Sequence, residues 1–173
     1  MRVDTTTSRA PDAAFLVAHP AHFIALGAGS GLVPWAPGTF GTLFGWGLYC
    51  VLALVLPPVV IAFLAIPLFF LGVWACDVTG RHLGVSDHGA IVWDEVVAFL
   101  PLAAIASAAW WLQAVAFALF RLFDIWKPYP IRLVDQNVKG GMGVMLDDVM
   151  AAAYAYMVFI LFIVVMHQGF GFA

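Results

Sequence analysis

Two pairs of adjacent carboxylates stand in apolar surroundings. Asp94 and Glu95 lie within IVWDEVVAFLP, and Asp147 and Asp148 lie within VMLDDVMAAAY. Desolvating a carboxylate costs several kcal/mol unless it is paired, protonated or bound to a metal. Each pair is predicted to open a helix, where the helix dipole favours negative charge. The dipole explains one acid at a helix start better than two, so the pattern favours a metal site.

Mg²⁺ is the cation that such a cluster indicates. Clustered carboxylates without a matching set of Cys and His ligands favour a hard cation, and Mg²⁺ is the usual one beside phosphate. Asp77 closes a long apolar run, with Arg81 four residues on, and is either a further ligand or half of a helix-end ion pair. The predicted metal ligands are Asp77, Asp94, Glu95, Asp147 and Asp148, of which the last four are also the predicted catalytic residues.

Two glycine-rich stretches could hold an anion. GAGSGLVPWAPGTFGT and KGGMGVMLDD each lead towards an apolar run. Glycine lets the backbone come close to a ligand, and N–H groups at a helix start bind phosphate. Neither stretch is a P-loop, and packing glycines are the alternative interpretation. The predicted phosphate contacts here are Gly38, Thr39, Gly41 and Thr42.

Basic residues gather around a stiff turn in RLFDIWKPYPIRLVD. Arg121, Lys127 and Arg132 could bind phosphate or attract anionic lipids, and both interpretations stay open. Lys127 is the best phosphate ligand, and Arg132 and Lys139 are predicted headgroup contacts. His88 lies in a glycine-flanked loop, where it could donate a proton, contact phosphate or have no catalytic role.

The composition indicates that a membrane positions these groups. Of 173 residues, 64% are hydrophobic and 10% are charged, whereas a soluble domain carries roughly 25% charged residues. The net charge of −3 argues against a nucleic-acid partner. Residues 13–76, 96–120 and 149–173 contain no Asp, Glu, Lys or Arg. These gaps are predicted to be embedded in the membrane.

An all-α, polytopic membrane bundle of about five helices follows from these gaps. A crossing needs about 20 apolar residues, and proline separates neighbouring helices. We expect a hairpin split at Pro57–Pro58, a second shorter hairpin, and a final crossing; the helices are expected at about 43–56, 59–76, 94–106, 110–124 and 149–167. A single helix over 96–120 is the alternative to the second hairpin. Residues 1–14 are predicted to be a mobile tail, and 15–173 a single membrane-embedded domain.

Each hairpin would cross the membrane and return, so all the charged clusters are expected on one face. The positive-inside rule makes that face cytoplasmic, so the loops there are expected to form a one-sided active site. A cation, anion-binding loops and a lipid-facing wall together indicate a site for a phosphorylated lipid. Metal-assisted attack by water is the default chemistry, and a covalent aspartyl-phosphate on Asp94 stays open. A transporter or channel using the acids as a cation or proton pathway, or a non-catalytic phospholipid-binding protein, are the other classes considered.

Four segments carry a resemblance to a known family: APGTFGT, DHGAIVWDEVV, FRLFDIWKPYPIR and GGMGVMLDDVMA. In this order and spacing, from about Gly29 to Ala155, the chain resembles the phosphatidylglycerophosphatase A family of bacterial membrane lipid phosphatases. Ala98 and Ala152 depart from the pattern, which has glycine at both positions, and we expect both to be helix-packing positions.

The resemblance implies Mg²⁺-dependent removal of phosphate from phosphatidylglycerophosphate, giving phosphatidylglycerol in phospholipid biosynthesis. It implies a multi-pass protein of the bacterial cytoplasmic (inner) membrane. The expected partners are that substrate and membrane lipids, with no nucleic acid. The oligomeric state is left open, with a homo-oligomer among the options.

Overall fold

The computed structural model describes residues 10–106 and 109–170, which form helices and turns with no strand. The all-α prediction is confirmed. The elements are α1 (Ala13–Ala18), α2 (Pro20–Ala25), the short helix η1 (Gly27–Leu32), α3 (Pro37–Leu52), α4 (Pro58–Leu83), α5 (Trp93–Ile105), α6 (Trp110–Trp126), α7 (Ile131–Asn137) and α8 (Gly140–Phe170). Asp12, within the predicted tail, caps α1 by accepting a hydrogen bond from the backbone N–H of Phe15.

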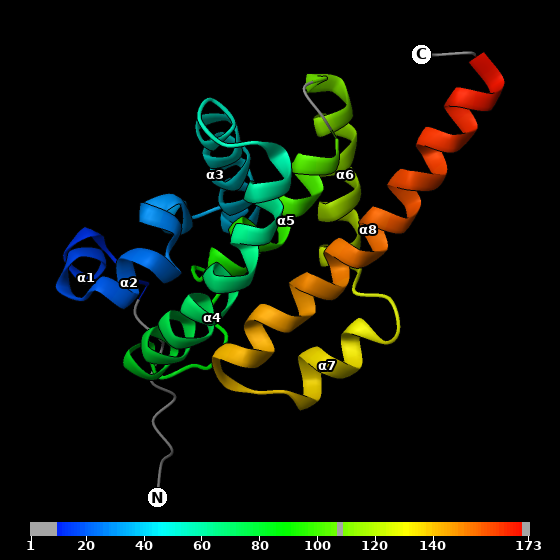
Figure 1. The fold of residues 1–173 in the computed structure, drawn as a ribbon. Coiled ribbons are helices and arrows are strands. Elements are labelled where there is room, and N and C mark those ends of the chain that lie inside the picture. Colours follow the sequence, from blue (N-terminus) through cyan, green and yellow to red (C-terminus); the bar gives the residue numbers. More distant parts are fainter. Residues whose placement is uncertain (1–9, 107–108, 171–173) are drawn as a thin grey trace, which may run out of the picture.

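Helix α5 forms the centre of the bundle. It contacts α3, α4, α6 and α8, which surround it in Figure 1. Its side chains Val96, Phe99 and Leu100 are fully buried. The Val92 N–H donates to the Ala25 carbonyl at 2.9 Å and joins the start of α5 to α2. The acids in the first turn of α5 are therefore held by a rigid, buried element.

Within residues 10–106 and 109–170, two helices are long and apolar enough to cross a membrane, α4 and α8. Helices α3, α5 and α6 have 16, 13 and 17 residues, fewer than the roughly 20 that a full crossing takes. Each of the five predicted helices corresponds to one of α3, α4, α5, α6 and α8, with shifted ends. Helix α5 ends at Ile105 and α6 begins at Trp110, as the two-helix interpretation of 96–120 expects. The membrane topology itself stays a prediction.

One predicted helix start is wrong. Asp147 and Asp148 do not open a helix, because α8 begins at Gly140, about two turns earlier. Glycine is a poor helix former, and this misled the prediction. Here the missing side chain is needed, since a Cβ on Gly141 would lie 1.9 Å from the Val73 carbonyl oxygen of α4. Close packing of α8 on α4 thus outweighs the low helix propensity.

Glycine has the same role in α3. The helix begins with Pro37, a favoured residue at the first helical position. A Cβ on Gly45 would lie 3.0 Å from the Cα of Val96, so α3 and α5 are in backbone contact at this point. Glycines in the second glycine-rich stretch and just after the first therefore pack helices together. In Figure 1, α7 and the start of α8 lie towards one end of the molecule, and the end of α3 and the start of α6 towards the other.

Candidate active site

Asp94 and Glu95 of α5 and Asp148 of α8 form a compact carboxylate cluster, called here the acidic triad. One ligand oxygen from each lies within 4.8 Å of the others. All three residues are more than nine-tenths buried. Asp94 Oδ1, Glu95 Oε2 and Asp148 Oδ2 are buried without a hydrogen-bond partner. Unpaired buried charge is costly, and a cation with oxygen ligands would satisfy it, so the triad could hold a metal ion.

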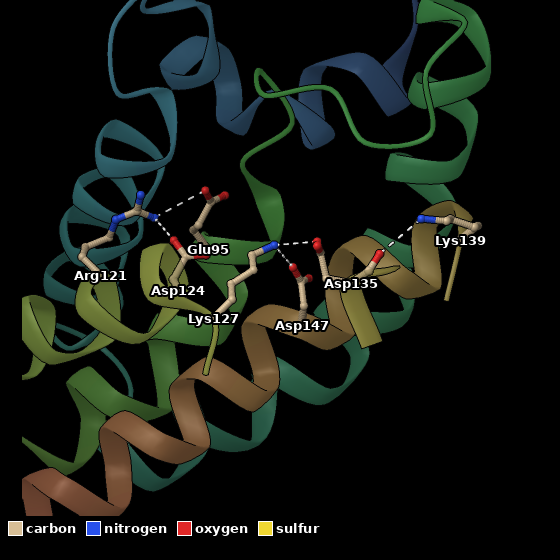
Figure 2. Close-up of polar contacts among 7 residues, drawn as sticks. All are labelled: Glu95, Arg121, Asp124, Lys127, Asp135, Lys139 and Asp147. Carbon is tan, nitrogen blue, oxygen red and sulfur yellow. Dashed lines mark hydrogen bonds and ion pairs between the residues drawn. The ribbon is translucent and has the colours of Figure 1, made fainter. Parts of the chain in front are cut away.

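Asp147 points to a different partner from its neighbour Asp148. The Lys127 ammonium donates to Asp147 Oδ2 at 2.5 Å and to Asp135 Oδ1 at 2.7 Å, as Figure 2 shows. Burial alone would lower the pKa of Lys127, but these two hydrogen bonds raise it above its usual value. Lys127 ends α6 in the left-handed conformation, with φ of 45°. The lysine is therefore a fixed positive charge beside the triad.

Arg121 of α6 brings a second positive charge to the site. Its guanidinium lies 3.5 Å from Glu95 Oε1 and forms an ion pair with Asp124 (Figure 2). The start of α3 closes over this contact, because a Cβ on Gly38 would lie 2.2 Å from Glu95 Oε1 and 3.0 Å from the guanidinium nitrogens. The positive end of the α3 dipole thus faces the carboxylates.

Negative charge exceeds positive charge in this region. Six carboxylates belong to the triad and its ion pairs, and only Arg121 and Lys127 oppose them, which leaves four negative charges. The carboxylates are Asp94, Glu95, Asp124, Asp135, Asp147 and Asp148. Burial makes such an excess unfavourable unless protons or added cations balance it. The site can therefore collect a divalent cation and, through it, an anionic substrate.

The other predicted acid lies apart from the triad. The Asp77 carboxylate pairs with Arg81 at 2.5 Å, and both side chains are exposed. Asp77 Oδ1 would lie 3.0 Å from a Cβ on Gly140, so it faces the start of α8. It is thus close to the helix that carries Asp148 but outside the group of three carboxylates.

The predicted phosphate contacts divide into buried and accessible groups. The Thr42 hydroxyl is fully buried and donates to the Gly38 carbonyl at 2.9 Å. Gly41 is buried against Val92, where a Cβ would lie 2.6 Å from the Val92 Cβ. Thr39, in the first turn of α3, is half-buried.

The remaining predicted contacts lie nearer the surface. His88 Nδ1 accepts a hydrogen bond from the Ala90 N–H at 3.1 Å, which shapes the loop before α5. Arg132 and Lys139 are exposed. The Lys139 ammonium donates to the Asp135 carbonyl at 3.3 Å (Figure 2). Lys139 is therefore joined through Asp135 to Lys127 and the edge of the site.

Asp124 and Asp135 were not singled out by the sequence, and Arg121 was considered for phosphate or lipid but not for a contact with Glu95. Arg121 and Asp124 are three residues apart, a spacing at which oppositely charged side chains meet on a helix. That signal identifies the pair but not its contact with Glu95, which depends on how α6 packs against α5. Asp135 carried no local signal, because its partner Lys127 lies beyond a turn.

The chain is similar in sequence to several known proteins. The phosphatidylglycerophosphatase A family model matches residues 23–163. A Haemophilus influenzae phosphatidylglycerophosphatase A is 48% identical over 141 residues, covering 81% of this chain and 86% of the relative. An Escherichia coli phosphatidylglycerophosphatase A is 40% identical over 136 residues, covering 78% of each chain.

A Bacteroides thetaiotaomicron protein provisionally named phosphatidylinositol-3-phosphatase is also similar, at 40% identity over 140 residues, with 77% of this chain and 87% of the relative covered. No solved structure matches the chain. The range matched by the family model contains every acid of the site, and the first two relatives each cover more than three quarters of the chain. The chain belongs to the phosphatidylglycerophosphatase A family.

Proposed function

We propose that this protein removes the phosphomonoester from phosphatidylglycerophosphate and releases phosphatidylglycerol, with Mg²⁺ as its cofactor. The observation that carries the proposal is the acidic triad: each of its three residues has one buried oxygen without a hydrogen-bond partner, in a chain of the phosphatidylglycerophosphatase A family. A structural ion pair would have used those oxygens within the protein. A bound cation would use them from outside.

Asp94, Glu95 and Asp148 would hold the Mg²⁺ ion. When bound, the ion supplies Lewis-acid chemistry: it neutralises phosphate charge and lowers the pKa of water. Asp147 stays bound to Lys127 and keeps the ammonium at the edge of the triad. The separation of roles between neighbouring aspartates is the basis of the experiments below.

The chain's own residues would bind the phosphate and move the proton. Lys127 and Arg121 lie on two sides of the triad and can share their hydrogens between carboxylates and phosphate oxygens. The first turn of α3, with Gly38 and Thr39, adds its positive dipole end. A triad carboxylate would take the proton of the attacking water as general base. Arg132, Lys139 and His88 are the proposed contacts to the rest of the headgroup.

The membrane arrangement is part of the proposal. Helices α4 and α8 would cross the bacterial cytoplasmic membrane, and α3, α5 and α6 would complete the two hairpins within it. The active site would face the cytoplasm, because the basic residues of the α6–α7 region are retained on that side. Thiol labelling of Lys139→Cys, in a chain whose exposed Cys50 is replaced by serine, tests the orientation in sealed, right-side-out vesicles. Labelling before the vesicles are opened would contradict a cytoplasmic site.

The decisive assay measures phosphate release from phosphatidylglycerophosphate by the purified protein in detergent micelles. We expect release with Mg²⁺ and none after chelation. Phosphatidylinositol 3-phosphate is the comparison substrate, since a relative carries that activity in its name. Headgroup binding without release would favour the non-catalytic lipid-binding class. Cation flux in liposomes without release would favour the transporter class.

The nature of the nucleophile is tested in the same sample. Direct attack by water leaves no phosphorylated protein, whereas an aspartyl-phosphate on Asp94 would be trapped by rapid acid quenching during turnover. We propose direct attack. Phosphate recovered on the wild-type chain but not on Asp94→Asn would overturn it.

A further inference from the structure

An apolar groove lies between α4, α5 and α8, next to the acidic triad. Its volume is about 580 Å³, within the roughly 300–1,000 Å³ typical of small-molecule sites. Phe69 of α4, Ala98 of α5 and Ala152 of α8 are among the lining residues. None of the residues assigned above to metal or phosphate lines this groove.

The groove starts at the triad and runs away from it. On α5 its lining begins at Val97, one turn after Asp94, and extends to Ile105. On α8 it begins at Leu146, beside the two aspartates, and extends to Tyr156. At 1.5 Å per residue these stretches span about 12 and 15 Å. The groove is therefore elongated and runs along α8, one of the two candidate membrane spans.

The chemistry of the lining selects an apolar occupant. Of the lining residues only Tyr156 carries a polar side-chain group, and it lies at the end away from the triad. Alanines at positions such as Ala65, Ala98 and Ala152 keep the groove open between the helices. Phe70 and Ile66 on its rim are 63% and 55% exposed, so the groove opens sideways, towards the surface that a bilayer would cover.

We propose that this groove binds one fatty acyl chain of the phospholipid whose phosphate lies at the acidic triad. The inference rests on the proposed function for the headgroup and adds how the rest of the lipid is recognised. A chain entering from the side can fill the groove without leaving the apolar phase, while the phosphate stays at the carboxylates. Ala98 and Ala152, both among the lining residues, help to set the width of this groove.

The experiment compares two substrates with one headgroup. Dioleoyl phosphatidylglycerophosphate is presented in nanodiscs, and the water-soluble dihexanoyl form is added from solution. Ala152→Phe fills the groove from a half-buried position, and Val158→Phe places the same bulk on the lipid-facing surface of α8 outside the groove. For Ala152→Phe we expect the KM for the dioleoyl lipid to rise about tenfold, because apolar contact is lost. Its kcat and the KM for the dihexanoyl lipid should stay near wild type.

Activity on the dihexanoyl lipid also shows that each variant is folded. An equal rise of KM for both lipids, or no change for either, would overturn the groove as an acyl-chain site. So would a Val158→Phe effect as large as that of Ala152→Phe. If the wild-type protein releases phosphate from neither lipid, the proposed function fails and the acyl-chain site fails with it. If phosphate is released but Ala152→Phe does not distinguish the dioleoyl from the dihexanoyl lipid, the acyl-chain site is rejected and the proposed function stands.

Discussion

Asp94–Glu95 and Asp147–Asp148 are both adjacent acidic pairs, but the fold uses them differently. Asp94 and Glu95 occupy the first turn of α5 and both join the acidic triad. Asp147 and Asp148 lie about two turns inside α8. Only Asp148 joins the triad, and Asp147 binds Lys127. One pair acts as a unit, and the other is divided between two partners.

Helix geometry explains the difference. Neighbouring residues on a helix point about 100° apart, so two adjacent side chains do not normally share a target. Glu95 has one methylene more than Asp94, and its longer reach allows convergence. Two aspartates of equal length diverge, so Asp148 reaches the triad while Asp147 reaches Lys127. The two adjacent acidic pairs in the sequence thus indicated a carboxylate cluster, but not which of the four side chains would come together.

The largest effect is expected from Asp148→Asn. Losing a triad carboxylate removes several kcal/mol of metal-derived stabilisation, which corresponds to about a thousandfold fall in kcat/KM. Thermal unfolding provides a readout besides activity. Saturating Mg²⁺ at about 100 Kd adds about 2.7 kcal/mol to the folded state, so it should raise the Tm of wild type but not of Asp148→Asn. An undiminished Mg²⁺ shift in the variant would remove Asp148 from the metal site.

Asp147→Asn, the same substitution one residue earlier, is expected to have a smaller effect. The amide leaves the triad intact but weakens the positioning of Lys127, so activity should fall about 10- to 100-fold, as for outer-shell residues. The Mg²⁺ shift of Tm should persist. A loss of activity and of the Mg²⁺ shift equal to those of Asp148→Asn would show that the two aspartates act as one pair after all.

Gly38→Ala tests the Glu95 half of the first pair. The added Cβ would push the Glu95 carboxylate and the Arg121 guanidinium aside. Both are ends of flexible side chains, so we expect little loss of stability but about a tenfold fall in kcat/KM, since a displaced catalytic group costs much of its effect. Gly47→Ala is the matched control in α3, because nothing lies within 4 Å of its added Cβ. Equal activity of the two variants would contradict the close approach of α3 to Glu95.

The smallest effect is expected from Asp77→Asn. Its exposed ion pair with Arg81 contributes little, about 0–1 kcal/mol in surface pairs of this kind, so activity should change less than about threefold. The sequence pattern nominates Asp77 as a metal ligand, and its position outside the triad argues for a helix-end ion pair. A loss of Mg²⁺ response comparable with that of Asp148→Asn would restore it to the metal site.

The sequence predicted the positions of the helices better than the packing contacts between them. Apolar run lengths and Pro57–Pro58 located five principal helices, because burial and proline act locally. Gly38 and Gly141 looked like loop or anion-binding residues, and both lie inside helices. Their place is decided by what packs against them, Glu95 in one case and Val73 in the other. Local propensity does not contain that information.

The site was predicted to a similar degree. Acids in apolar flanks identified all three members of the triad, since a buried charge without an evident partner demands an explanation. Arg121 was recognised as a basic residue, but its contact with Glu95 spans separate helices and was not foreseen. The division between Asp147 and Asp148 likewise depends on the rotation of α8 about its axis.

That rotation has a consequence for how the chain can change over time. One residue inserted or deleted between Gly143 and Asp147 would turn the rest of α8 by about 100° and shift it by about 1.5 Å relative to its start. Both aspartates would then leave their partners together. Many positions of α8 can vary in residue type, but the spacing from its glycine-rich start to its acids cannot vary in length. Descendants of this chain should therefore differ here by substitution, and gaps in this stretch should be confined to copies that have lost activity.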